Sequence, residues 1–131
     1  MNCEVIFTET ANDPISYPAF QARLRQFMEE RDWKQFHNPK DMAIAISLES
    51  SELLEHFLWM NGADIDSRVT AHGEGIREEM ADIGIYLMEL CDVLGIDLIA
   101  AMSDKLDKAA LKYPIEKAKG SNKKYTELGD E

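Results

Sequence analysis

The sequence predicts an all-α protein: an antiparallel four-helix bundle-like domain that assembles into an oligomer. Apolar residues recur at helical spacing in four segments, whereas the alternation typical of strands is missing. The length of 131 residues, with 45% hydrophobic and 30% charged residues, fits one globular domain. The second and third segments are apolar over wide arcs, which indicates burial against a partner subunit as well as within the bundle.

An N-terminal arm of residues 1–17 is expected before the first helix. Residues 3–8 could form a short strand, but the sequence offers no evident partner strand. The first helix is expected over about residues 18–31, because Pro18 suits the first helical position. Its apolar positions follow the helical period: Phe20, Leu24, Phe27 and Met28.

The second and third helices are expected over residues 39–61 and about 74–94. Asn38 is a good N-cap for the second helix, and Gly62 stops it. Gly95 occupies the position that ends the third helix. Glycines at positions 73 and 75 weaken the stretch before residue 76, so an earlier first turn near residue 66 stays an open alternative.

The fourth helix is expected to follow its N-cap Asp97 and to run to Lys112. Tyr113-Pro114 ends it, because the residue before a proline avoids the helical region. Residues 18–112 would then form the helical domain. Residues 113–131 would form a lysine-containing C-terminal tail without periodicity.

The net charge of −11, from 25 acidic and 14 basic residues, excludes general binding to nucleic acids or anionic membranes. No apolar run approaches the roughly 18 residues that a membrane span needs. The first residues lack the features of a secretory signal, and two cysteines are too few for a disulfide framework. We therefore expect a cytoplasmic protein with idle or buried thiols.

Two acidic pairs lie within the apolar faces of the second and third helices. On a wheel of about 100° per residue, Glu49 and Glu52 fall inside the apolar arc of the second helix. In the third helix, Glu79 lies inside the arc and Asp82 at its edge, whereas Glu78 and Glu89 fall toward the polar side. Acidic i,i+3 pairs are common by chance in so acidic a chain, so their place on the helix is the stronger signal.

Buried carboxylates need cationic partners or a metal, because an unpaired buried charge is costly. Basic residues are scarce on these faces, and four carboxylates make an all-oxygen site that suits Mg²⁺ or Mn²⁺. The alternative is that these acids are rim residues, salt-bridged or partly hydrated. Trp59 and Tyr86 lie one or two turns beyond the acids, where they could stack on a nucleobase or simply pack in the core.

Several other kinds of site are absent from the sequence. Neither a phosphate-binding P-loop nor a dinucleotide-binding glycine fingerprint occurs. The three histidines lack the Glu-x-x-His spacing of di-iron bundles, and they are too scattered for a zinc site.

The acidic motifs resemble a known family. Glu49-Ser-Ser-Glu52 followed by Glu79-Met-Ala-Asp82 resembles the E-x-x-E…E-x-x-D signature of the MazG-like all-α nucleoside triphosphate pyrophosphohydrolases. The flanking segments are similar to those of the dCTP pyrophosphatase group within it. These segments are Arg31–His37, Asp82–Tyr86, Lys112–Pro114 and Lys123–Leu128.

The resemblance implies Mg²⁺-dependent cleavage of a (deoxy)nucleoside triphosphate to the monophosphate and pyrophosphate, with dCTP preferred, by the domain of residues 18–112. It implies dimers or tetramers whose active sites are completed by neighbouring chains. The implied metal ligands are Glu49, Glu52, Glu79 and Asp82. The implied lining of the base pocket is His37, Trp59 and Tyr86, with Trp33 nearby.

Other candidate residues follow from this role. Glu55 could orient the attacking water, or it could be a surface acid. Lys105 and Lys112 on the fourth helix could bind the polyphosphate, and so could Lys123 in the tail. Tyr125, in the matched tail segment, is placed with the substrate-binding residues.

The chain departs from its relatives at Ala109-Ala110, where they usually carry Asn and a basic residue. The departure puts a sugar or phosphate contact, and hence the substrate, in doubt. The alternative function is a non-catalytic helical module that binds a nucleotide or a protein.

Overall fold

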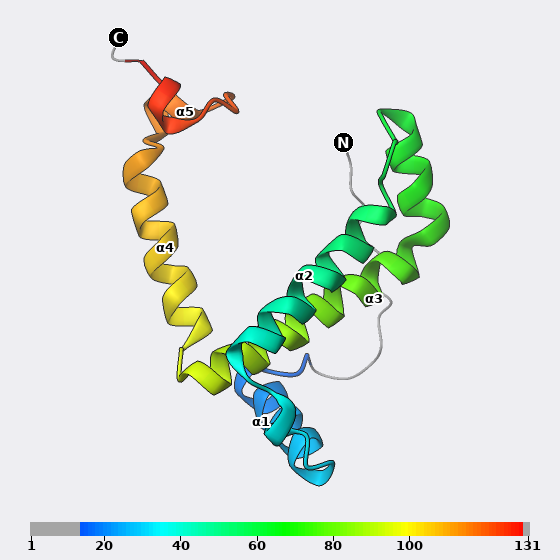
Figure 1. Ribbon diagram of the computed structural model, residues 1–131. Coiled ribbons are helices and arrows are strands. Elements are labelled where there is room, and N and C mark those ends of the chain that lie inside the picture. The colour runs from blue at the N-terminus through cyan, green and yellow to red at the C-terminus, as the bar shows by residue number, and fades with distance from the viewer. Residues whose placement is uncertain (1–13, 130–131) are drawn as a thin grey trace. The chain divides into compact units, whose positions relative to one another are not determined.

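The computed structural model describes residues 14–129, and all of their regular secondary structure is helical. The expected strand at residues 3–8 and most of the expected arm lie outside the described residues. The chain divides into two compact units, residues 1–35 and 36–131, which are described separately below. The α-helices are α1 (Tyr17–Glu30), α2 (Pro39–Glu55), α3 (Ala63–Leu94), α4 (Leu98–Lys112) and α5 (Ile115–Ala118), and short 3₁₀ turns cover Lys34–Phe36 and Tyr125–Glu127 (Figure 1).

The first unit is built around α1, which begins and ends within a residue of its expected bounds. The Ser16 hydroxyl accepts a hydrogen bond from the Ala19 amide at 3.3 Å and so caps the first turn. Beyond the helix, Trp33 packs edge-on against Phe27 with ring centroids 5.7 Å apart. The guanidinium of Arg31 lies 3.7 Å from the centroid of the same Phe27 ring.

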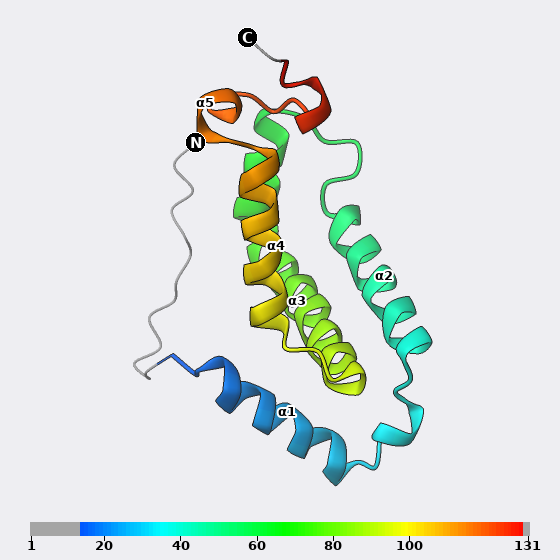
Figure 2. The ribbon, with the colours of Figure 1, turned by 90° about the vertical axis from the view of Figure 1, so that its left-hand side faces the viewer.

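The second unit is organised by α2 and α3, which lie side by side and run antiparallel (Figure 2). The Asn38 side chain accepts a hydrogen bond from the Asp41 amide at 3.0 Å, which confirms the predicted N-cap of α2. The helix ends at Glu55, so the prediction that it reaches Asn61 was wrong. The backbone of Trp59 has a φ of 64°, which a right-handed helix does not accommodate.

Helix α3 begins at Ala63, about a dozen residues before the expected start. The glycines do not prevent helix formation there; the helix instead bends at His72, whose φ and ψ are −126° and 21°. Gly75 allows a close approach, because a Cβ at this position would lie 3.1 Å from Cε1 of His56. At the other end, Gly95 has a φ of 65° and closes the helix as predicted.

Helix α4 has its predicted bounds, and the Asp97 side chain accepts a hydrogen bond from the Ala100 amide at 3.0 Å. It diverges from the α2–α3 pair, and none of its residues is buried (Figure 1). Within residues 36–129 the extensive helix packing is between α2 and α3, so a closed four-helix bundle stays a prediction. The tail is more ordered than expected, because it contains α5 and a 3₁₀ turn. Among the described residues, no helix is both long and apolar enough to cross a membrane.

We expect Asn38→Ala to lower the free energy of unfolding by about 1 kcal/mol, because the Asp41 amide would lose its hydrogen-bond acceptor. Urea denaturation followed by circular dichroism measures the change. Lys40→Ala is the control, since its side chain is 80% exposed in the same helical turn. Equal stabilities of the two variants would contradict a stabilising role for the cap.

Candidate functional site

Three carboxylates from α2 and α3 converge in the second unit. One oxygen each of Glu49, Glu79 and Asp82 lies within 4.8 Å of the other two. Glu79 and Asp82 share a face of α3 because they are three residues apart, and the packing of α2 places Glu49 opposite them. Within the described part of the chain, none of the three forms an ion pair with a lysine or arginine. The cluster therefore lacks a protein cation to balance its charge.

The electrostatics of Glu49 reflect this crowding. Burial raises the pKa of Glu49 above its ordinary value, and neighbouring negative charges raise it further. A hydrogen bond with Glu79 acts in the same direction, and the neighbouring charges belong to Glu52, Asp82 and Glu79. Carboxylates that disfavour one another's ionisation form a site that a divalent cation would stabilise.

Glu52 lies beside this cluster, and its oxygens are not part of the three-carboxylate group. It lines an adjoining cavity of about 370 Å³ together with Glu79. The other lining residues are Glu55, His56 and Arg68. The cavity thus places His56 and Arg68 beside the acidic cluster. The sequence did not predict a role for either side chain.

Tyr86 and Glu89 extend the site toward the C-terminal end of α3. Burial raises the pKa of the Tyr86 phenol, and so do the nearby charges of three carboxylates: Glu49, Glu89 and Asp82. Glu89 itself is only 6% exposed, so its placement on the polar side of the wheel was wrong. The signal that could have identified it is its spacing of seven residues from Asp82, which returns to the same helix face.

Glu89 faces His37, which was expected to line a base pocket. His37 Nδ1 lies 3.3 Å from Glu89 Oε2, but the geometry is not that of a hydrogen bond. This buried carboxylate oxygen accepts no hydrogen bond from any described residue. Burial raises the pKa of Glu89 to about 7. A buried carboxyl of this kind, three residues from Tyr86, is typical of a functional site rather than of a stabilising core.

The remaining aromatic candidates lie outside the helices. The side chain of Trp59 is 91% exposed in the connection between α2 and α3, although the wheel placed it on the apolar face of a longer helix. Trp33 belongs to the first unit, where it packs against Phe27.

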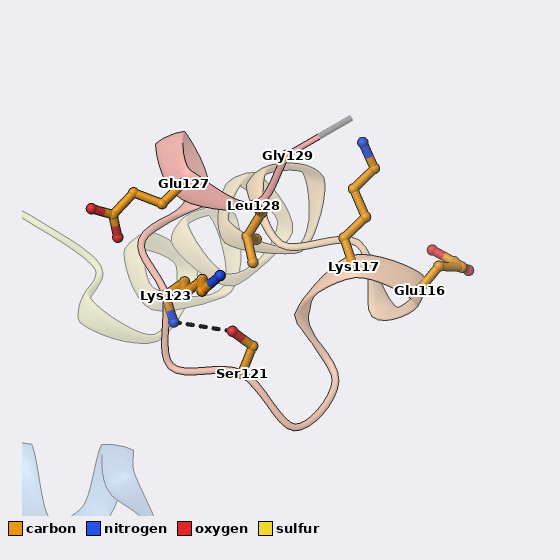
Figure 3. Close-up of a pocket in the computed structure, with 7 residues that line it drawn as sticks. All are labelled: Glu116, Lys117, Ser121, Lys123, Glu127, Leu128 and Gly129. Carbon is orange, nitrogen blue, oxygen red and sulfur yellow. Dashed lines mark hydrogen bonds between the residues drawn. The ribbon is translucent and has the colours of Figure 1, made fainter. Parts of the chain in front are cut away.

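The basic candidates lie on α4 and the tail, away from the α2–α3 pair (Figure 1). Lys105 and Lys112 belong to α4, and the Lys112 ammonium lies 5.0 Å from the centroid of the Tyr125 ring. Figure 3 shows Lys123 in a separate cavity of about 590 Å³ within the tail, where its amide donates to the Ser121 hydroxyl at 3.3 Å. A single chain therefore does not bring these residues to the carboxylates.

We expect the stability of the protein to fall as pH rises from about 5 to about 8, because of Glu89. The folded carboxyl keeps its proton up to a pKa of about 7, whereas an unfolded glutamic acid loses it near 4.5. Between pH 5 and pH 8 the parent protein should lose about 2–3 kcal/mol of unfolding free energy from this group. Glu89→Gln should not show this loss. Urea denaturation at both pH values measures the difference.

Glu78→Gln, an exposed change on the same helix, is the control and should keep the pH dependence of the parent protein. The parent protein could instead become more stable than Glu89→Gln as pH rises from 5 to 8. That outcome would show that the pair with His37 favours the charged carboxylate. That result would contradict the raised pKa.

Comparison with known proteins places this site in a family. The pattern of the MazG-like family matches residues 44–128, which include both acidic motifs. The chain is 36% identical to the dCTP pyrophosphatase 1 of Homo sapiens over 105 residues, which cover 79% of this chain and 62% of that protein. It is 35% identical to the dCTP pyrophosphatase 1 of Bos taurus over 127 residues, which cover 91% and 75% of the two chains. It thus spans less than two thirds of the length of the human protein.

A solved structure agrees with this assignment. A pyrophosphatase from Archaeoglobus fulgidus matches with a TM-score of 0.69 and 40% identity, over 72% of this chain and 89% of the other. The matched family segment contains the converging carboxylates Glu49, Glu79 and Asp82. The chain belongs to the MazG-like family.

Proposed function

We propose that the protein is a Mg²⁺-dependent pyrophosphohydrolase that converts a (deoxy)nucleoside triphosphate to the monophosphate and pyrophosphate. The observation that carries the proposal is the convergence of Glu49, Glu79 and Asp82 from two helices. The names of the relatives support dCTP as the preferred substrate. Residues 18–112 would be the catalytic domain, and the buried free thiol of Cys91 suits a reducing, cytoplasmic setting.

The donor set fits a hard divalent cation. Its three oxygens are close enough to share one ion, and all three are carboxylate oxygens, which Mg²⁺ and Mn²⁺ prefer over thiolate or imidazole ligands. Glu52, which adds its charge next to Glu49, would be the fourth ligand. A cation here supplies positive charge against the phosphates and makes water a better nucleophile.

The chain's own residues would position the substrate and the water. Glu55 shares a cavity with Glu52 and Glu79, where its carboxylate could accept a proton from the attacking water. His37 and Tyr86 would contact the nucleobase on the other side of the carboxylates. By the family resemblance, Trp59 would line the base pocket and could stack on the base.

We infer that a second copy of the chain completes this site. Ile99, Met102 and Leu106 form one stripe of α4, and they are 49%, 46% and 71% exposed in the described chain. Packing of this stripe against another subunit would remove apolar surface from water. The same assembly could bring Lys105, Lys112, Lys123 and Tyr125 of α4 and the tail to a neighbouring chain's carboxylates.

We expect the protein to be a dimer or tetramer in solution, and Leu106→Glu to shift it toward smaller species, because a charge would enter the apolar stripe. Sedimentation equilibrium measures the molecular mass. Lys108→Glu, a change of charge at an exposed position on the same helix, is the control. A monomeric parent protein would contradict the inferred assembly.

The activity is tested by pyrophosphate release from the four common dNTPs with Mg²⁺, where we expect turnover with dCTP the best substrate. Glu49→Gln and Asp82→Asn should each reduce kcat at least about 100-fold, because they remove charge that holds the cation. Glu78→Gln, which lies outside the cluster, should retain activity.

The alternative function, a non-catalytic module that binds a nucleotide or protein, predicts a different outcome. It predicts nucleotide binding by calorimetry without hydrolysis of any dNTP. Cation binding is measured separately, since Mg²⁺ should raise the melting temperature of the parent protein but not that of Asp82→Asn. Turnover that is unaffected by both cluster variants would contradict the proposed site.

A further inference from the structure

The cavity of about 370 Å³ beside the carboxylates contains an arginine with no partner among residues 14–129. Arg68 is half-buried and lines the cavity with Glu52, Glu55 and Glu79, yet it forms no ion pair or hydrogen bond with any described residue. Arg77 on the same helix behaves differently, because its guanidinium donates to Glu74 at 2.9 Å. A guanidinium offers five N–H donors, and partial burial removes water that would otherwise satisfy them.

A second nitrogen group lines the same cavity. His56 lies at the C-terminal end of α2, and its ring rests against α3 where Gly75 lacks a side chain. Cε1 of His56 would be only 3.1 Å from a Cβ at that position, so a larger residue there would displace the ring by a few tenths of an ångström. The bend of α3 at His72 accompanies it, with the two histidine rings 6.4 Å apart.

The cavity lies on one side of the carboxylates along α3, and the nucleobase candidates lie on the other. Arg68 precedes Glu79 by about three helical turns, whereas Tyr86 and Glu89 follow Asp82 by about one and two turns. A nucleotide whose base lies beside Tyr86, and whose reacting phosphate lies at the carboxylates, would extend its remaining phosphates toward Arg68.

We propose that Arg68, together with His56, forms a subsite for the distal phosphates of the substrate and for the pyrophosphate that is released. This inference rests on the proposed function, because it takes the carboxylates as the place of the reacting phosphate. Arginine binds phosphate oxygens through two parallel hydrogen bonds, which suits a group fixed at the wall of a cavity. Because three carboxylates share that wall, phosphate binding there requires a divalent cation.

Calorimetric titration with pyrophosphate, in the presence and absence of Mg²⁺, tests the subsite on the full chain. We expect binding by the parent protein only with Mg²⁺, and Arg68→Gln to weaken it roughly tenfold or more, because a charge-assisted contact is lost. Arg68→Lys should restore part of the affinity, since it keeps the charge without the fork of donors. Arg77→Gln is the matched control and should bind pyrophosphate like the parent protein.

A second measurement separates phosphate binding from general damage to the site. Arg68→Gln should raise KM for the triphosphate by a similar factor while the affinity for the nucleoside monophosphate product stays unchanged. Equal pyrophosphate affinity in Arg68→Gln and Arg77→Gln would overturn the subsite, and so would absence of binding by the parent protein. So would a loss in Arg68→Gln that Arg68→Lys does not partly restore, because it would point to misfolding.

The two proposals can fail separately. If the parent protein hydrolyses a dNTP but Arg68→Gln binds pyrophosphate normally, the subsite is wrong and the proposed function stands. If the parent protein hydrolyses no dNTP, yet its Mg²⁺-dependent affinity for pyrophosphate falls in Arg68→Gln alone, the phosphate site stands and the proposed reaction is wrong.

Discussion

Repulsion among carboxylates held together by two packed helices is the interaction on which the rest of the site depends. Helices α2 and α3 fix Glu49, Glu79 and Asp82 so that their oxygens lie within 4.8 Å, and no described lysine or arginine is paired with them. Like charges at this distance oppose folding, as the raised pKa of Glu49 indicates. The packing of α2 on α3 must outweigh that repulsion. A bound cation would turn this repulsion into net attraction. The stability of the helix pair would then depend on occupancy of the site.

The pattern of the sequence identified this pair of helices for a clear physical reason. Cap residues and helical periodicity are local signals, so Asn38, Asp97 and Gly95 marked helix ends correctly. The acids Glu49 and Glu79 could be found because they interrupt apolar arcs. Such signals act within a few residues of one another, and they agree here with the packing of the helices.

The parts that could not be predicted depend on contacts between distant segments. The contact of Glu89 with His37 joins positions more than fifty residues apart in the sequence, and a wheel of one helix does not include it. The helix continues across Gly73 and Gly75 with a bend at His72, and the ring of His56 lies 3.1 Å from where a Cβ at position 75 would be. Propensity alone treats those glycines as helix breakers, whereas tertiary packing reverses their effect.

The distribution of charge along α3 agrees with the orientation proposed for a nucleotide substrate. Toward its C-terminal end lie Tyr86 and Glu89, a phenol and a buried carboxyl that offer hydrogen-bonding groups but no fixed positive charge. Toward its N-terminal half lies the guanidinium of Arg68, which pairs with no residue that the structure describes. A base, which is neutral, is compatible with the first environment, whereas a polyphosphate would find no positive charge there. The carboxylate cluster separates the two environments, so the bond between the first and second phosphates would lie where cations can gather. In the proposed reaction, that arrangement would favour release of pyrophosphate over release of a single terminal phosphate.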